Sequence, residues 1–349
     1  MHRTSHRRFA RTLLLIAILL IPLIGGATPA AGQRADESHE YRYLMGTSVQ
    51  VQASGGDETT RRTAIDEAFG AFAEVDRLMS NYRDDSELAL INRSAARGVV
   101  SVSDPMFGVL DAARRVSSAS HGAFDITVGP LVRLWGFHDK KPHVPTDAEL
   151  ATVRTLVDYR YVILDAEHHT VRFARPGVEL DLGGIAKGFA VEVAAGVLRR
   201  RGLSGFIDAG GNQYLLGTPP GKRTWNVGIK NPAVPDRVMG VVEIGEISVS
   251  TSADYYNFLV ATGRTYGHIL DPLTLAPATE ALSVTILSRD ATLGDALSKA
   301  AFILGPKAGL ALVDSFPGMS AVIAYRKTDG TVGVAVSQRL AGSYQPTSR

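Results

Sequence analysis

Residues 178–188, with the sequence VELDLGGIAKG, are the first candidates for chemistry. An apolar run that predicts a strand ends at Asp181, two glycines follow, and a helical pattern begins with Lys187 in its first turn. A glycine turn at a helix N-terminus exposes backbone N–H groups to a phosphate, and the helix dipole and a lysine favour its charge. The spacing is neither that of a P-loop nor GxGxxG. The acid suggests a second contact, with a ribose, a ring or a metal.

Acids, glycines or a histidine also stand where predicted strands end in three other segments, at residues 123–131, 207–212 and 266–272. In addition, a predicted helix over residues 292–304 carries Asp295 near its start and stops at Gly305-Pro306. The candidate residues are therefore spread over the chain, and the fold must bring them together.

The elements that position these segments mix helices with strands. The spacing of apolar residues predicts helices over residues 59–79, 88–92, 105–120, 187–201 and 292–304, the last followed by a second helix. Strands are predicted over residues 41–53, 161–164, 170–173, 178–181, 205–212 (ending in an acid and paired glycines), 225–230, 241–244, 247–250 and 282–287, with a hairpin turn at Asp329-Gly330.

Two of these predictions are specific about connections. Residues 41–53 are expected to form one strand with Met45-Gly46-Thr47 inside it, and residues 241–244 to pair with 247–250 across Gly245-Glu246. No internal repeat or low-complexity linker divides the chain. We therefore expect one α+β unit over residues 41–340, preceded by a flexible lead at 32–40 and followed by a frayed tail at 341–349.

The N-terminus has the pattern of a secretory signal peptide. A basic segment with four arginines precedes an apolar run over residues 13–24, and small residues follow up to position 31. The run is short for a membrane span, so we expect cleavage after residues 1–31 and export to the periplasm or the outer face of the inner membrane. An uncleaved anchor is the alternative, and it would be the chain's contact with a membrane.

Composition excludes several classes of function. The chain has 349 residues, 45% of them hydrophobic, with 37 basic and 35 acidic residues. Removal of residues 1–31 leaves 33 basic against 35 acidic residues, so nucleic acid is not an expected partner. Because the sequence has no cysteine, disulfides, thiolate catalysis and iron–sulfur clusters are excluded, which suits an exported protein.

Five motifs in order resemble those of the ApbE family, the FAD:protein FMN transferases. The resemblance runs from Met45 to Gly305. The motifs are FDITVGPL at 124–131, LDLGGIAKG at 180–188, DAGGN at 208–212, HILDP at 268–272 and DALS at 295–298. It implies an α+β fold of the ApbE type, a single mixed α/β catalytic unit with mostly antiparallel sheets and flanking helices.

The resemblance also implies an activity. The family uses Mg²⁺ and FAD, releases AMP, and attaches FMN through a phosphoester to a Thr or Ser of an exported acceptor protein, here expected to be a redox-pump-type subunit. The residue types suit this chemistry. Backbone N–H groups and a lysine hold a pyrophosphate, a carboxylate and a carbonyl suit Mg²⁺, and a histidine suits a base. An FAD pyrophosphatase giving FMN and AMP, and a non-catalytic periplasmic FAD-binding protein, remain alternatives.

The resemblance assigns roles to individual residues. His268 would be the base or would at least orient the acceptor, and Asp295 would be the principal metal ligand, with the Gly184 carbonyl near the metal. The implied FAD contacts are Met45, Tyr82, Ala123, Phe124, Asp125, Asp181, Lys187 and Ile269.

Position 299 departs from the family pattern. The usual motif places a threonine, which also reaches the metal, four residues after the acid, and this chain has Lys299 there. Residues at i and i+4 project from the same helix face. Lys299 could bridge Asp295 at the surface, replace part of the cation's charge, or weaken Mg²⁺ binding.

Each candidate also has a purely structural interpretation. Asp295 could serve the helix dipole, Gly183-Gly184 could be a plain turn, and Asp125 could cap its own turn, as could Asp208, which we leave out of the site. Four other histidines, including His138, lack a ligand-like framework and are interpreted as solvated.

Overall fold

The computed structural model describes residues 36–347 except 140, 142, 254–257 and 262–263. The chain divides into two units, Met1–Ala35 and Asp36–Arg349, and every element below belongs to the second. The expected signal peptide at residues 1–31 and the first part of the expected lead lie outside the described residues.

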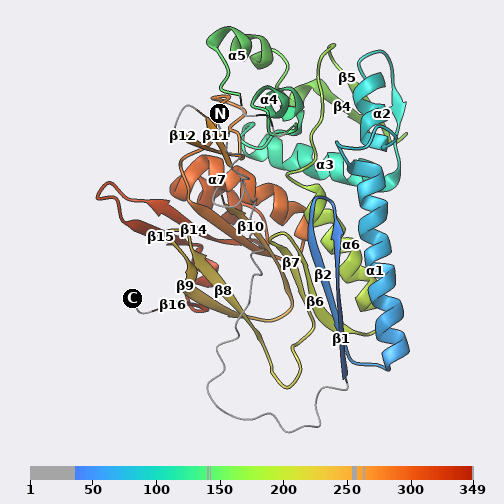
Figure 1. Cartoon of the computed structure of the whole chain (residues 1–349), viewed down its shortest axis with the longest axis vertical. Coiled ribbons are helices and arrows are strands. Elements are labelled where there is room, and N and C mark those ends of the chain that lie inside the picture. Colours follow the sequence, from blue (N-terminus) through green and yellow to red (C-terminus); the bar gives the residue numbers. More distant parts are fainter. Residues whose placement is uncertain (1–35, 140, 142, 254–257, 262–263, 348–349) are drawn as a thin grey trace, which may run out of the picture. The chain divides into compact units, whose positions relative to one another are not determined.

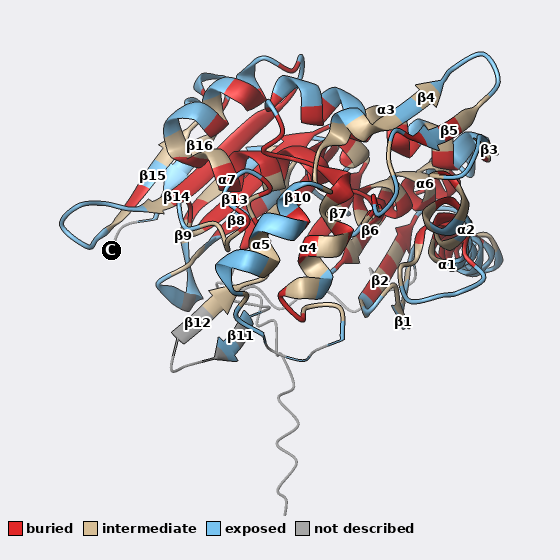
Figure 2. Ribbon diagram, turned by 90° about the horizontal axis from the view of Figure 1, so that it is seen from above, coloured by how far each residue is buried: buried red, intermediate tan, exposed pale blue. Residues whose placement is uncertain are grey.

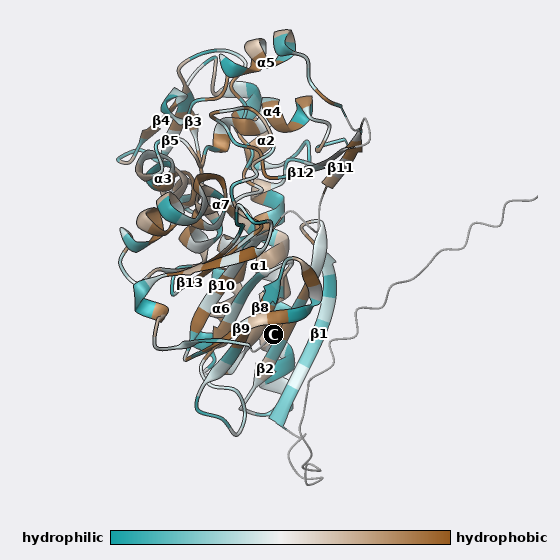
Figure 3. Cartoon of the chain, turned by 90° about the vertical axis from the view of Figure 1, so that its left-hand side faces the viewer, coloured by the Kyte–Doolittle hydropathy of each residue, from teal (hydrophilic) through white to brown (hydrophobic). Residues whose placement is uncertain are grey.

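A large antiparallel sheet forms the centre of this unit (Figure 1). Each strand pairs antiparallel with its neighbours in the sheet. In spatial order the strands are β1 (Glu37–Leu44), β2 (Thr47–Ser54), β6 (Ser204–Ala209), β7 (Asn212–Leu216), β10 (Ile247–Ala253), β13 (Ser283–Ser288), β14 (Ser320–Arg326) and β15 (Val332–Val336). The edge strand β1 is mostly hydrophilic (Figure 3), which suits a strand with one unpaired side.

Helices pack on one face of the sheet and turn their buried sides toward it (Figure 2). Their apolar residues recur at helical spacing, and capping residues define their starts: the Asp57 carboxylate, for example, accepts a hydrogen bond from the Thr60 N–H (2.7 Å). The helices on the sheet are α1 (Glu58–Met79), α6 (Ala186–Arg200) and α7 (Ala291–Asp314), while α2 (Glu87–Ser94) packs on α1 and α3 (Asp104–Ala119) packs on α7.

A small sheet covers the opposite face. It consists of β8 (Trp225–Asn231), β9 (Val234–Ile244) and β16 (Tyr344–Pro346). Neighbouring residues of β10 face opposite layers. Val249 belongs to the core cluster shared with β8 and β9. Ser250 faces α7, because a Cβ on Gly294 of that helix would lie 3.4 Å from the Ser250 hydroxyl. The period-2 alternation of a strand thus divides the core into two layers.

The remaining elements are short. They are β3 (Val100–Ser101), β4 (Val162–Asp165), β5 (Thr170–Phe173), β11 (Phe258–Ala261), β12 (Arg264–Gly267), α4 (Gly129–Leu134), α5 (Asp147–Arg154) and the 3-10 turns η2 (Ile126–Val128), η3 (Tyr159–Tyr161) and η4 (Gln338–Leu340). A separate hydrophobic cluster that includes Leu131, Trp135 and Leu270 joins α4 to the chain that follows β12.

Most predicted helices and hairpins are confirmed to within a few residues. Gly305 interrupts α7 with φ 74° and ψ −173°, as its predicted stop requires. By length and hydropathy α7 is the one helix among the described residues that could span a membrane. More than half of its most apolar stretch is buried, and it packs on the large sheet.

Three predictions about strands and two about the ends of the domain are wrong. Residues 41–53 form a hairpin whose turn is Met45-Gly46, both at positive φ. Residues 241–244 and 247–250 lie in two different sheets. Residues 37–40 of the expected lead belong to β1, and residues 344–346 of the expected tail pair with β9 as β16. The Tyr344 side chain explains why the tail pairs with β9. Its ring packs against Gly240, where an added Cβ would lie 2.4 Å from the ring.

The fifth error concerns residues 178–181, which form no strand in the structure. The Asn92 side chain instead takes the place of a partner strand: its amide nitrogen donates to the Leu180 carbonyl (3.0 Å), and its oxygen accepts the Leu180 N–H (2.8 Å). The Asp181 N–H donates to the Ile126 carbonyl (2.7 Å). The segment therefore forms hydrogen bonds with Asn92 and Ile126, but outside the sheet.

Candidate functional site

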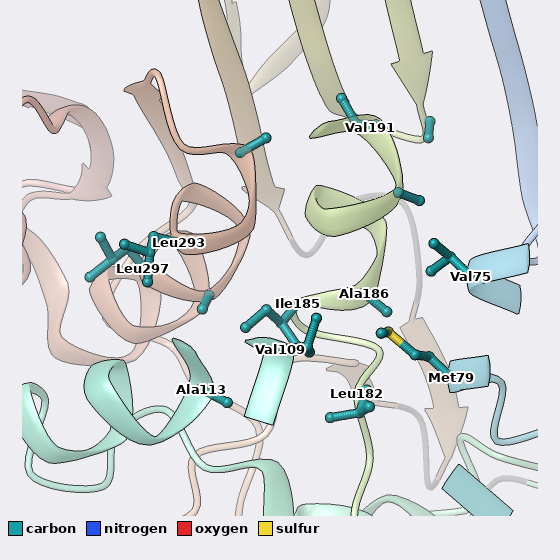
Figure 4. Close-up of a cluster of buried hydrophobic side chains, with 14 of the residues drawn as sticks. Val75, Met79, Val109, Ala113, Leu182, Ile185, Ala186, Val191, Leu293 and Leu297 are labelled. Carbon is teal, nitrogen blue, oxygen red and sulfur yellow. The ribbon is translucent and has the colours of Figure 1, made fainter. Parts of the chain in front are cut away.

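The turn at residues 181–188 is held in the hydrophobic core. Its apolar residues pack between helices from three directions: Leu182, Ile185 and Ala186 lie among side chains of α1, α3 and α7 (Figure 4). Helix α6 begins at Ala186 without a side-chain cap of its own. The packing of these apolar side chains therefore positions one side of the turn, and its polar groups lie on the other side.

A carboxylate and an ammonium frame this turn. The Asp181 carboxylate accepts the Gly183 N–H (2.7 Å), and the Lys187 ammonium donates to the Gly183 carbonyl (3.0 Å). Burial raises the pKa of the Asp181 carboxyl, and the Gly183 N–H and the positive charge of Lys187 oppose that shift. The predicted phosphate lysine therefore lies at the turn, next to the predicted acid.

Gly188 allows α6 and α7 to touch. A Cβ at this position would lie 2.2 Å from the Ala291 carbonyl oxygen and 2.6 Å from the Asp295 Cβ, so only glycine fits. The Gly188 N–H, in the first turn of α6, donates to Oδ2 of Asp295 (2.9 Å). Asp295, which is fully buried, therefore acts as the anion at the N-terminus of α6.

Lys299 forms an ion pair with the same carboxylate. Its ammonium donates to Oδ1 of Asp295, and the lysine side chain is 18% exposed. Burial lowers the pKa of Lys299, and the charge of Lys187 lowers it further, while Asp295 opposes both. The stem of Lys299 approaches the glycine turn, because a Cβ on Gly184 would lie 3.9 Å from its Cγ.

The predicted metal ligands do not fit a divalent cation. One oxygen of Asp295 accepts the Gly188 N–H and the other accepts the Lys299 ammonium, and a protonated lysine is not a metal ligand. Within the described part of the chain, no group of three His, Cys, Asp or Glu residues could hold a metal ion. The carboxylate that was expected to bind Mg²⁺ is instead bound by a cation that belongs to the chain.

The segment at residues 123–131 packs against the turn. Phe124 is 5% exposed, and its Cε2 would lie 3.1 Å from a Cβ on Gly184. Its N–H donates to the Ser120 hydroxyl (3.1 Å), and the N–H of the buried Ala123 donates to the Ser120 carbonyl (3.1 Å). The structure therefore brings this predicted nucleotide segment beside the predicted phosphate turn.

Asp125 is bound by its own segment and by the first residue of η3. It caps η2 by accepting the Thr127 N–H and hydroxyl (both 2.7 Å) at Oδ1, and it accepts the Tyr159 N–H (2.7 Å) at Oδ2. Burial raises the pKa of Asp125 to about 6, although these hydrogen bonds favour the charged form. The structural interpretation of this residue is confirmed, and its contact with FAD stays a prediction.

Tyr82 lies on the connection between α1 and α2 and is 74% exposed. Its ring stacks on His138, with 4.9 Å between the ring centroids and 18° between the planes. Although the side chain as a whole is largely exposed, partial desolvation raises the pKa of the Tyr82 hydroxyl, and the negative charges of Asp181 and Asp139 raise it further.

The solvated interpretation of His138 is therefore wrong. Its side chain is only 18% exposed, and its Nε2 lies 3.3 Å from the Asn81 carbonyl. The sequence signal at His138 is its position in a polar, glycine-rich segment, and this signal does not identify the residue that His138 contacts. Asn92, which holds the turn through Leu180, was also missed.

The other predicted residues lie on neighbouring elements. Met45 lies in the β1–β2 turn at φ 49° and packs against the main core, and Ile269 is a 6% exposed member of that core. His268 is partly buried and follows β12 directly. On its C-terminal side the Ile269 carbonyl accepts the Ala278 N–H (2.9 Å), and the Asp271 carboxylate accepts the Leu273 N–H (2.8 Å), so the backbone after His268 is held in place.

Comparison with known proteins agrees with this architecture. The sequence model of the ApbE family matches residues 45–323. An FAD:protein FMN transferase of Vibrio cholerae is 32% identical over 310 residues, which cover 86% of this chain and 90% of the relative. Another, from Treponema pallidum, is 33% identical over 327 residues, which cover 89% and 90%.

Solved structures agree as well. The ApbE protein from Thermotoga maritima superposes with a TM-score of 0.79 at 31% identity, covering 87% of this chain and 97% of that one. The flavin transferase ApbE from Vibrio cholerae superposes with a TM-score of 0.78 at 30% identity, covering 88% and 98%. The predicted resemblance and fold class are confirmed, and the chain belongs to the ApbE family.

Proposed function

We propose that the protein is an FAD:protein FMN transferase that moves FMN from FAD to a Thr or Ser hydroxyl of an exported acceptor protein and releases AMP. The observation that carries the proposal is the turn at residues 181–188, where Lys187 and Lys299 place two ammonium groups beside a glycine turn and Phe124 lies next to them. Cations and a backbone that can be approached closely suit a pyrophosphate, and an aromatic wall suits the rings of FAD.

In the transfer step the acceptor oxygen forms a bond to the phosphorus of the FMN half. The bond from that phosphorus to the bridging oxygen breaks, and AMP leaves with that oxygen. The hydroxyl proton passes to an imidazole nitrogen of His268, since a base with a pKa near neutrality suits this transfer. The two ammonium groups offset the negative charge of the pyrophosphate. Mg²⁺, which the resemblance implied, has no part in this proposal because the Asp295 carboxylate is already occupied.

A direct assay tests the activity. The mature protein is mixed with FAD and a purified exported candidate acceptor, with Mg²⁺ and separately with EDTA, and both the acceptor and the nucleotides are analysed by mass spectrometry. We expect an FMN adduct on a Thr or Ser and one AMP for each adduct. FMN and AMP without an adduct would identify an FAD pyrophosphatase, and FAD that stays bound and unchanged for hours would identify a binding protein.

The role of His268 has its own test. His268→Ala should reduce the rate of adduct formation by about 100-fold or more, the usual contribution of a general base, while the Kd for FAD stays within about threefold. His168→Ala is the matched control, because that histidine has a 66% exposed side chain and bonds to Asp165. Equal transfer rates for the two variants would show that His268 is not the base.

Export is part of the same proposal. The acceptor is expected outside the cytoplasm, as a subunit of a redox pump, and the pattern of residues 1–31 supports a signal peptide. N-terminal sequencing of the protein recovered from cell fractions distinguishes cleavage after residue 31 from an uncleaved anchor.

A further inference from the structure

The cation at the centre of this site is supplied by the chain. We propose that the Lys299 ammonium is the resident cation of the site, that it holds the pyrophosphate of FAD together with Lys187, and that turnover therefore needs no divalent metal at Asp295. This inference rests on the proposed flavin transfer and specifies how the same site neutralises its substrate.

The first support is the environment of Asp295. The carboxylate is fully buried, and its two oxygens receive the Gly188 N–H and the Lys299 ammonium. A buried carboxylate requires a cation or several hydrogen-bond donors. Because Lys299 supplies the cation, a metal would have to displace the ammonium before it could bind the carboxylate.

The burial of the pair rules out a simple surface ion pair. Exposed ion pairs contribute little because water screens them. Here the carboxylate is fully buried and the lysine side chain is 18% exposed. The ammonium is therefore fixed in position, with a small part of the side chain still accessible to a ligand.

The second support is where Lys299 lies. Its Cγ would be 3.9 Å from a Cβ on Gly184, and Lys187 donates to the carbonyl of Gly183, so both lysines meet the same glycine turn. Asp181 and Asp295 balance the two positive charges, so the side chains of the site together are close to neutral. A divalent ion added there would face two ammonium groups, whereas a pyrophosphate would be attracted by both.

Metal binding can be measured independently of catalytic activity. Mn²⁺ is titrated into the protein with FAD, and free Mn²⁺ is followed by electron paramagnetic resonance, with FAD alone as the reference. Wild-type protein should bind no more Mn²⁺ than FAD does by itself. Lys299→Thr, which restores a hydroxyl ligand, should bind Mn²⁺ at least tenfold more tightly than wild type does. Lys307→Thr, at an exposed lysine on the same helix, should behave as wild type.

Turnover supplies the second readout. Wild-type protein should consume FAD at the same rate in EDTA and in Mg²⁺, and Lys299→Thr should be inactive in EDTA and regain activity in Mg²⁺. Lys299→Arg keeps the positive charge and serves as a second variant in case Lys299→Thr does not fold. Its turnover of FAD should remain independent of Mg²⁺. Tight Mn²⁺ binding by the wild type, or loss of its turnover in EDTA, would overturn the inference. Absence of any adduct in both conditions would count against the transferase proposal alone, because the Mn²⁺ titration still decides which cation the site holds.

Discussion

The two sides of the site are built differently. On one side, α6 and α7 meet at Gly188, and the polar groups that bind anions or cations are buried between helices. On the other side, Tyr82 and His138 stack on connecting segments, and Tyr82 is largely exposed. The buried side is suited to hold one ligand in a fixed geometry. The exposed side is suited to admit a second partner, which for a transferase is the acceptor protein.

Gly188→Ala should show the largest effect, because it forces the two helices of the buried side apart. The new Cβ would clash with the backbone of Ala291, and overpacking of this kind costs about 3 kcal/mol of the free energy of unfolding. Urea unfolding measures the loss, and the affinity for FAD should fall with it.

Gly196→Ala, in the same helix, is the matched control for this substitution. Its new Cβ would come no nearer than 3.4 Å to a neighbouring side-chain atom, Nη1 of Arg200, so we expect a gain of about 0.5–1 kcal/mol. Similar losses in both variants would show that the contact between α6 and α7 is not special.

Asp125 predicts how the free energy of unfolding depends on pH. Below about pH 4 its carboxyl is protonated in both states, and at higher pH the unfolded chain, with a pKa near 3.8, loses the proton before the folded protein does at about 6. Stability should therefore fall by about 3 kcal/mol as the pH rises through this window and stay constant above it.

Unfolding free energies of wild type and Asp125→Asn, measured from pH 4 to pH 7, test this. The variant lacks the titration, so its stability relative to wild type should rise across the window, whatever constant cost its amide causes opposite the Tyr159 N–H. Parallel profiles would mean that Asp125 does not titrate in this range.

Tyr82→Ala should have the smallest effect on the fold and a measurable one on the ligand. Because Tyr82 is 74% exposed, its loss should change the free energy of unfolding by less than about 0.5 kcal/mol. If FAD stacks against it, the affinity should fall about tenfold, as the loss of an aromatic contact implies, and Tyr82→Phe should retain it. An unchanged Kd for FAD in the alanine variant would remove Tyr82 from the flavin site.

Local signals predicted the parts of the fold that depend on neighbouring residues. The glycine and proline at 305–306 marked the interruption of α7. The five motifs identified the family and the residues of the turn. What local pattern cannot show is a partner far along the chain: the strand-like residues 178–181 are bound by Asn92 and Ile126 instead of by a strand.

The candidate site was likewise predictable only where the signal is local. The i,i+4 spacing predicted that Asp295 and Lys299 share a face, but only the packing of α6 on α7 shows that the pair is buried and that Gly188 completes it. Met45-Gly46 was interpreted as a strand interior because a two-residue turn and a strand glycine are similar in sequence. The register with β2 distinguishes them.

The hydrogen bonds from Asn92 to Leu180 have a consequence for local unfolding. The Leu180 N–H lies outside every helix and strand, yet the side chain of a residue in α2 protects it. Its exchange with solvent therefore reports the opening of that eight-residue helix, and a fluctuation that releases α2 also releases the chain one residue before Asp181. Opening of the short helix thus also loosens the chain at the start of the turn at residues 181–188.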